Sequence, residues 1–124
     1  MAPRDAAVRQ ITDQVLLREI VSASADSALR QAATKELTDQ ALLATLVKTD
    51  ADWQVREAAA QRLTDQAVLR DVAKTDREGS VRLAAVLALK DEGLLAEIAA
   101  SDEDASVRHA AQEEVSAAAS RRRA

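Results

Sequence analysis

An arginine recurs every 26 residues along this chain of 124 residues, at Arg4, Arg30, Arg56, Arg82 and Arg108. Aspartates recur with the same period a few residues ahead of the later arginines, at Asp50, Asp76 and Asp102. A guanidinium can bind a carboxylate or a phosphate through two parallel hydrogen bonds. The row could therefore form a ladder for phosphate or acidic partners, or it could pair with the aspartates and hold neighbouring segments in register. We expect the structural role.

The arginines belong to a tandem repeat. Residues 37–62 read LTDQALLATLVKTDADWQVREAAAQR, and residues 63–88 read LTDQAVLRDVAKTDREGSVRLAAVLA. Blocks 11–36 and 89–114 follow the same pattern, residues 1–10 fit the second half of a block, and residues 115–124 extend the last one. A period of roughly 20–50 residues is typical of stacked repeats. We therefore expect a single domain over 1–124, with a half-repeat, four full repeats and a C-terminal extension.

Each block predicts two short amphipathic helices. In block 37–62 the first has apolar residues at Leu42, Leu43, Leu46 and Val47, which share one helical face. Thr12, Thr38 and Thr64 are the predicted N-caps of the first helices, and Asp91 is the predicted cap in the fourth block. The second helices are predicted to begin after Asp26, Asp52, Glu78 and Asp104, and each carries a pair of alanines. Small side chains let neighbouring helices pack closely, so the sequence predicts an all-α fold.

Composition excludes several kinds of site. The chain has no cysteine and one histidine, which excludes disulfides, thiolate metal sites and histidine clusters. Its net charge of −4 argues against nucleic acid as a partner. No apolar run approaches the roughly 20 residues of a membrane helix, and the N-terminus lacks the apolar core of a secretory signal. We expect no cofactor, no metal and a cytoplasmic protein.

Two departures from the repeat are candidate partner-binding sites. Trp53 stands where the other blocks have Ser27, Gly79 and Ala105, and it is either a partly exposed anchor or a ring folded over the packed helices. The third block carries an additional apolar stripe, Leu83, Val86 and Leu87. This stripe is either a surface for a partner or a second copy, or it is buried by neighbouring helices. We favour the partner surface.

The string D-x-x-V-R-x-A-A, seen in residues 52–59 and 104–111, together with LTDQ at the start of a block, resembles the HEAT-like repeats. The short unit looks most like the HEAT-like repeats of phycobilin lyases, and it is also similar to the leucine-rich-repeat variant. The resemblance implies a right-handed α-solenoid with the second helices lining its inner surface. It also implies that each recurring arginine bonds the turn acid of a neighbouring unit.

These features favour a non-enzymatic protein–protein interaction or scaffold module that binds a protein or peptide on the inner helix face. The alternative, by analogy with the family, is an accessory or lyase-like protein acting on a tetrapyrrole or a nucleic acid. DNA glycosylases with HEAT-like repeats use a basic groove with aromatic residues, and this chain is acidic with one tryptophan. No residue is predicted to be catalytic.

Overall fold

A computed structural model describes residues 14–123, and every element in this range is a helix. Most of the helices are about ten residues long, as the two predicted helices per block require. Their bounds are α2 Gln14–Ala23, α3 Ser27–Thr34, α4 Gln40–Thr49, α5 Trp53–Arg62, α6 Gln66–Thr75, α7 Gly79–Ala88, α8 Glu92–Ser101 and α9 Ala105–Arg123. The prediction of an all-α fold is confirmed. The predicted half-repeat 1–10 and the predicted cap Thr12 lie outside the described residues.

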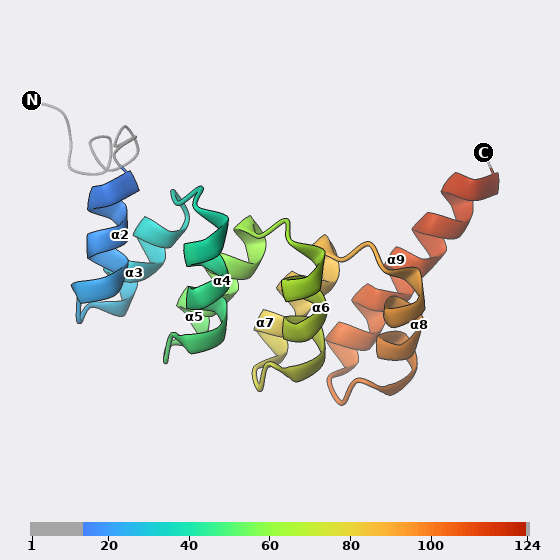
Figure 1. Cartoon of the computed structure of the whole chain (residues 1–124). Coiled ribbons are helices and arrows are strands. Elements are labelled where there is room, and N and C mark those ends of the chain that lie inside the picture. Colours follow the sequence, from blue (N-terminus) through green and yellow to red (C-terminus); the bar gives the residue numbers. More distant parts are fainter. Residues whose placement is uncertain (1–13, 124) are drawn as a thin grey trace, which may run out of the picture. The chain divides into compact units, whose positions relative to one another are not determined.

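The helices belong to two compact units, Met1–Arg62 and Leu63–Ala124. Within the first, α2 packs against α3, α4 against α5, and α3 against α5. Within the second, α6 packs against α7, α8 against α9, and α7 against α9 (Figure 1). Each unit holds two of the sequence blocks, and the boundary between the units coincides with the boundary between blocks 37–62 and 63–88. This pairing is consistent with helical repeats.

The core of each unit lies between the first and second helices of its pairs. In the first unit, Leu43, Leu46 and Val47 of α4 are buried beside Ala58 and Ala59 of α5. In the second unit the same positions are buried, at Leu69, Val72, Ala73, Ala84 and Ala85. Burial of each large aliphatic side chain stabilises the fold by about 1.5–3 kcal/mol, and the alanines leave room for those side chains to pack.

The first helices begin one residue later than predicted from the threonines. Their N-caps are Asp39, Asp65 and Asp91, whose carboxylates accept hydrogen bonds from backbone N–H groups of the first turn. The prediction of Thr38 and Thr64 as caps is therefore wrong, whereas that of Asp91 is confirmed. A charged carboxylate is favoured over a hydroxyl here because the N-terminus of a helix carries partial positive charge.

The second helices begin as predicted. Asp26 accepts from the Ala28 and Leu29 N–H groups, Asp52 from Gln54, and Asp104 from Ser106. Glu78 occupies the cap position of α7 without a side-chain hydrogen bond to the helix. The last helix, α9, is much longer than α5 and α7, and its final turns extend past α8 (Figure 1). The predicted extension 115–124 is thus helical as far as Arg123.

Candidate functional site

The recurring arginines connect one turn to the next within each unit. In the first unit, Arg30 donates from Nε and Nη2 to the two carboxylate oxygens of Asp50, at 3.2 and 3.4 Å. In the second, Arg82 donates in the same way to Asp102, at 3.0 and 3.1 Å. The remaining Nη1 of each arginine reaches the turn of its own repeat, at Ser24 O and Asp76 O respectively. All three donor nitrogens are therefore used.

The turn aspartates are held from a second side. Asp50 accepts the backbone N–H of Asp52, and Asp102 accepts that of Asp104, at 2.9 and 2.8 Å. Ser24, which replaces the aspartate in the first repeat, accepts the Asp26 N–H with its hydroxyl oxygen. Each turn is therefore held by a hydrogen bond of its own as well as by an arginine. The hydrogen bonds to the Asp102 carboxylate raise the pKa of the Arg82 guanidinium above its ordinary value.

Two other arginines keep the contact with their own turn. Arg56 donates to Asp50 O and Ala51 O, and Arg108 donates to Asp102 O at 2.7 Å. Asp76 accepts the backbone N–H of Glu78. Arg108 is the last of the row, and residues 14–123 supply no carboxylate to its Nε and Nη2. Arg4 lies outside the described residues.

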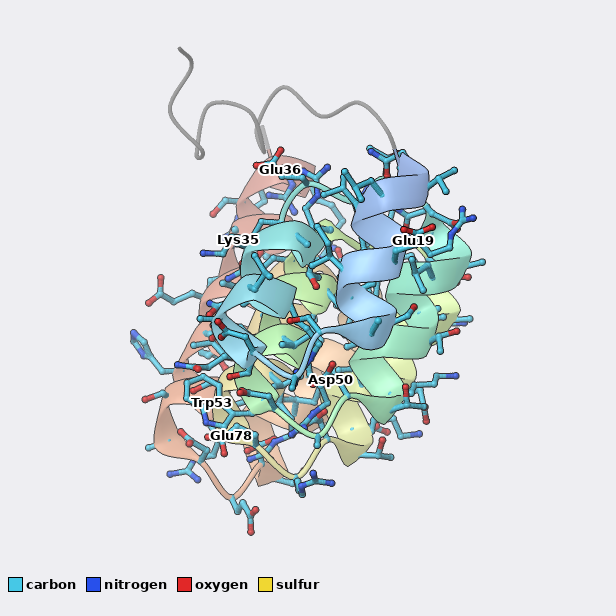
Figure 2. The ribbon with its side chains drawn as sticks, turned by 90° about the vertical axis from the view of Figure 1, so that its left-hand side faces the viewer. Glu19, Lys35, Glu36, Asp50, Trp53 and Glu78 are labelled. Carbon is cyan, nitrogen blue, oxygen red and sulfur yellow. The ribbon has the colours of Figure 1, made fainter. Side chains whose placement is uncertain are left out.

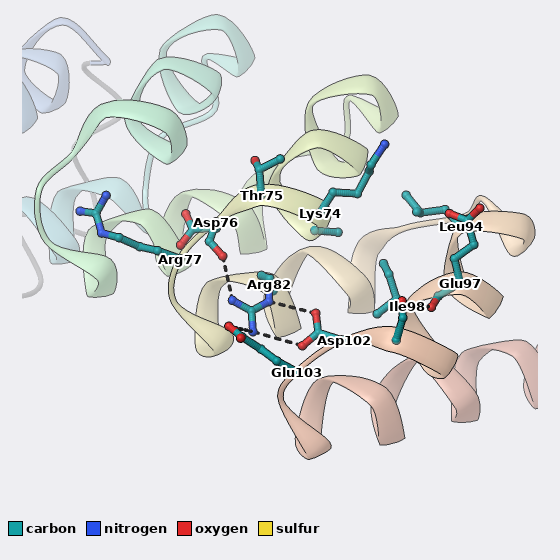
Figure 3. Close-up of a pocket in the computed structure, with 12 residues that line it drawn as sticks. Lys74, Thr75, Asp76, Arg77, Arg82, Leu94, Glu97, Ile98, Asp102 and Glu103 are labelled. Carbon is teal, nitrogen blue, oxygen red and sulfur yellow. Dashed lines mark hydrogen bonds and ion pairs between the residues drawn. The ribbon is translucent and has the colours of Figure 1, made fainter.

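A cleft lies above the Arg82–Asp102 pair, between the end of α6 and α8 (Figure 3). Its volume is ≈ 530 Å³, and its rim carries Lys74, Arg77, Glu97 and Glu103. The equivalent cleft in the first unit, over Arg30 and Asp50, is ≈ 510 Å³ and has neutral residues such as Ser22 and Thr45 at its rim. At the floor of each cleft, every nitrogen of the guanidinium already donates one hydrogen bond to a protein oxygen. Because the Nε–Nη2 fork is occupied by a carboxylate, neither arginine can bind a phosphate through that fork.

Trp53 is the first residue of α5, and its side chain is 38 % exposed. Figure 2 shows it on the side of the first unit formed by the second helices, near the turn that contains Asp50. In the equivalent position of the preceding repeat, the Ser27 hydroxyl donates to Asp52. This bond and the backbone N–H of Gln54, which is the larger cause, hold the pKa of Asp52 below its ordinary value. The Trp53 side chain is therefore partly exposed and is not buried over the packed helices, and its role as an anchor for a partner stays a prediction.

The additional apolar stripe of the third block is not one surface. Leu87 is 60 % exposed and Leu83 is half-buried, but Val86 is fully buried, so its side chain cannot contact a partner. The residues at the position of Val86 in the two preceding repeats, Thr34 and Ala60, are also fully buried. The Thr34 hydroxyl is satisfied by the Arg30 carbonyl, which makes burial of a polar residue tolerable there. This position therefore belongs to the core. The prediction that Val86 contacts a partner was wrong, because the polar Thr34 at the equivalent position suggested an exposed site.

Leu87 adjoins a cavity of ≈ 550 Å³ in the second unit. The cavity lies between the end of α7, the α7–α8 linker and the C-terminal half of α9. Its walls include Leu89, Leu95 and Ala118, which are buried, and charged residues stand around them. The residues at the position of Leu87 in the other repeats are all exposed and polar, namely Lys35, Gln61 and Glu113. Leu87 is therefore an apolar residue at a position where the other repeats have exposed polar residues, and it borders this cavity.

A glutamine that was not among the predicted site residues joins consecutive repeats. Gln14 donates from Nε2 to Glu36 O and accepts the Thr38 N–H with Oε1. Gln66 makes the same two bonds, to Ala88 O and from the Lys90 N–H, at 3.1 and 2.8 Å. A primary amide carries both a donor and an acceptor, which this double contact requires. The recurring Q of LTDQ was the signal for it.

The fourth block replaces this glutamine with Glu92, which cannot donate. Glu92 forms an ion pair with Arg122, near the end of the long α9. The arginine-rich end of the chain is thus bound to its own fold at this point. His109 is exposed and pairs with Glu113 one turn away on α9.

Residues 14–123 contain no group of three or more metal-ligating side chains and no helix long and apolar enough to cross a membrane. Comparison with known proteins adds no family: no family model matches the chain, and no curated protein or solved structure matches it.

Proposed function

We propose that the chain is a non-enzymatic protein-interaction module, built as a right-handed α-solenoid of HEAT-like repeats. The recurrence of the same three devices supports the repeat assignment: the capping aspartate, the arginine–aspartate pair and the bridging glutamine. All three fix neighbouring turns and linkers, so they serve architecture and leave the surface of the second helices to bind a partner.

The observation that carries the proposed function is the exposure of Leu87. A leucine that is 60 % exposed beside a partly apolar hollow is the kind of anchor position that protein partners bury. Leu83, one turn earlier on α7 and half-buried, widens this surface. Trp53 is the corresponding candidate in the first unit. The occupant of the Leu87 surface is another protein or peptide, and a second copy of the chain is one such protein.

The test is photocrosslinking in the cells that make the protein. A photoreactive phenylalanine analogue placed at residue 87 should give discrete adducts, while the same analogue at Glu97, on the exposed side of α8, should not. A second copy of the chain would be recognised by the mass of the adduct. Leu83→Asp should suppress the adducts at residue 87 without changing helical circular dichroism. Equal labelling at residues 87 and 97, or none at either, would refute the proposal.

A further inference from the structure

The linker beside the cavity at Leu87 has an equivalent in the first unit, which an arginine of the chain binds. At the end of α5, Arg62 donates from both Nε and Nη2 to the carbonyl of Leu37, each at 3.2 Å. Leu37 lies in the linker between α3 and α4, and Leu89 is its equivalent in the linker between α7 and α8. The residue equivalent to Arg62 on α9 is Glu114. In the second unit, therefore, a carboxylate stands where the first unit has a guanidinium.

This replacement leaves the linker between α7 and α8 without the hydrogen-bond donor that Arg62 provides in the first unit. Residues 14–123 make no hydrogen bond to the Leu89 carbonyl, whereas the Leu37 carbonyl receives two from Arg62. Leu89 and Glu114 both line the ≈ 550 Å³ cavity, together with Leu87, Leu95 and Ala118. The cavity is thus lined by the residue whose carbonyl has no hydrogen bond from the described part of the chain, by an acidic residue and by apolar residues.

We infer that this cavity is a binding site for an arginine side chain of a protein partner. The inference deepens the proposed function, because it names the chemistry that the surface around Leu87 recognises. The apolar walls fit the methylene stem of an arginine, and the Leu89 carbonyl and the Glu114 carboxylate are acceptors for its guanidinium. Arg62 makes the guanidinium–carbonyl part of this contact within the chain, on Leu37.

The charges around the cavity favour a planar guanidinium over a compact ammonium group. Lys90 and Arg121 also line it, and Glu92 is already paired with Arg122, so Glu114 is the carboxylate left for a ligand. An ammonium offers a compact charge, whereas a guanidinium offers a planar fork of donors that can reach the carbonyl and the carboxylate together. The net charge of the whole chain, −4, favours approach of a basic partner.

The experiment titrates the protein with N-acetyl-arginine-N-methylamide and follows backbone amide resonances of Leu89, Lys90 and Ala118. Saturable shifts are expected with the arginine amide, and the norleucine amide should bind at least about tenfold more weakly because it lacks the charged donors. Glu114→Arg, which supplies the chain's own guanidinium to Leu89 as Arg62 does to Leu37, should abolish the saturable shifts. Arg121→Ala removes a like charge at the rim and should tighten binding.

Glu113→Arg is the matched control, since it makes the same charge change one residue away at an exposed position that does not line the cavity. It should bind the arginine amide as the unmodified protein does. Glu114→Gln keeps the size of the side chain and should weaken binding even if Glu114→Arg does not fold. Equal binding of the norleucine amide, unsaturable shifts, or unchanged binding by Glu114→Gln would overturn the inference. The adducts at residue 87 do not depend on these results, so a failed titration would leave the proposed function standing.

Discussion

Arg82 and Asp102 form a two-pronged ion pair that is almost shielded from water, with side chains that are 7 % and 8 % exposed. The third nitrogen of Arg82 holds the Asp76 carbonyl of its own turn at 2.8 Å. One side chain therefore fixes two successive helix–helix turns of the second unit relative to each other. Arg30 does the same in the first unit with Ser24 and Asp50. Register between neighbouring helix pairs is set at these turns.

Arg82→Ala should destabilise the protein by about 3–5 kcal/mol, because it leaves the buried Asp102 carboxylate without its partner. Arg108→Ala is the matched comparison, since Arg108 makes the same contact with its own turn and binds no carboxylate within residues 14–123. Its loss should lower the free energy of unfolding by only about 1 kcal/mol. Urea unfolding followed by circular dichroism at 222 nm would measure both. Equal losses would show that the carboxylate pair contributes nothing to stability.

Local pattern was sufficient to predict the helices, and it failed where packing decided the outcome. The spacing of Leu43, Leu46 and Val47 specifies a helix face whatever surrounds it, so the two helices per block could be predicted. Whether Val86 is exposed depends on how much of the surface of α7 the neighbouring helices cover. The sequence alone does not show how much is covered. The equivalent core position in the first repeat holds Thr34, a polar residue whose hydroxyl donates to the Arg30 carbonyl.

The same distinction explains which parts of the candidate site were found. Oppositely charged residues that recur with one period, such as Arg82 and Asp102, predict a pair by their chemistry alone. The cavity beside Leu87 arises from a combination of changes, including Glu114 in place of the equivalent Arg62 and a helix that continues past its usual end. Each change is visible in the sequence. Together these changes form a cavity. Predicting a cavity requires the relative positions of the three segments that surround it, which the sequence does not give.

Leu87→Asp and Val86→Asp should separate surface from core on adjacent residues of α7. Leu87 is 60 % exposed, and an aspartate there should change the free energy of unfolding by no more than about 0.5 kcal/mol. Val86 is fully buried, and an aspartate there would place an unpaired charge in the core, with a loss of at least about 3 kcal/mol or failure to fold. Thermal unfolding of the two variants is the measurement. A comparable loss in both would mean that Leu87 belongs to the core.

The bridging glutamine gives a prediction with an internal control. Gln66→Glu keeps the acceptor for the Lys90 N–H but replaces the donor to Ala88 O with a carboxylate oxygen, which repels the carbonyl. The expected loss is about 1–3 kcal/mol, since the carbonyl loses its partner in a part-buried site. Arg122→Ala breaks the exposed pair with Glu92 and should change stability by no more than about 1 kcal/mol. Chemical unfolding of both variants would test this order, and a larger loss for Arg122→Ala would contradict it.

Acid should weaken the fold through the capping carboxylates. The backbone N–H of Leu42 is the largest cause that lowers the pKa of Asp39, and the backbone N–H of Gln54 does the same for Asp52. Because each folded-state pKa lies below the ordinary value of 3.8, the unfolded chain binds these protons more tightly. Their contribution to stability is therefore complete above that value, and it is lost as the pH falls through the lower folded-state pKa.

The pair of substitutions Asp39→Asn and Asp52→Asn should consequently flatten the acid side of the stability profile. Asparagine is as good an N-cap as aspartate and does not titrate, so the double variant should keep most of its stability near neutral pH. Urea midpoints at a series of pH values from about 5 down to about 2 would show the smaller slope. Asp71→Asn is the control, since it removes an exposed carboxylate to which no residue of 14–123 donates a hydrogen bond. If the double variant and the unmodified protein lose stability in parallel, carboxylates other than these two caps control the response to acid.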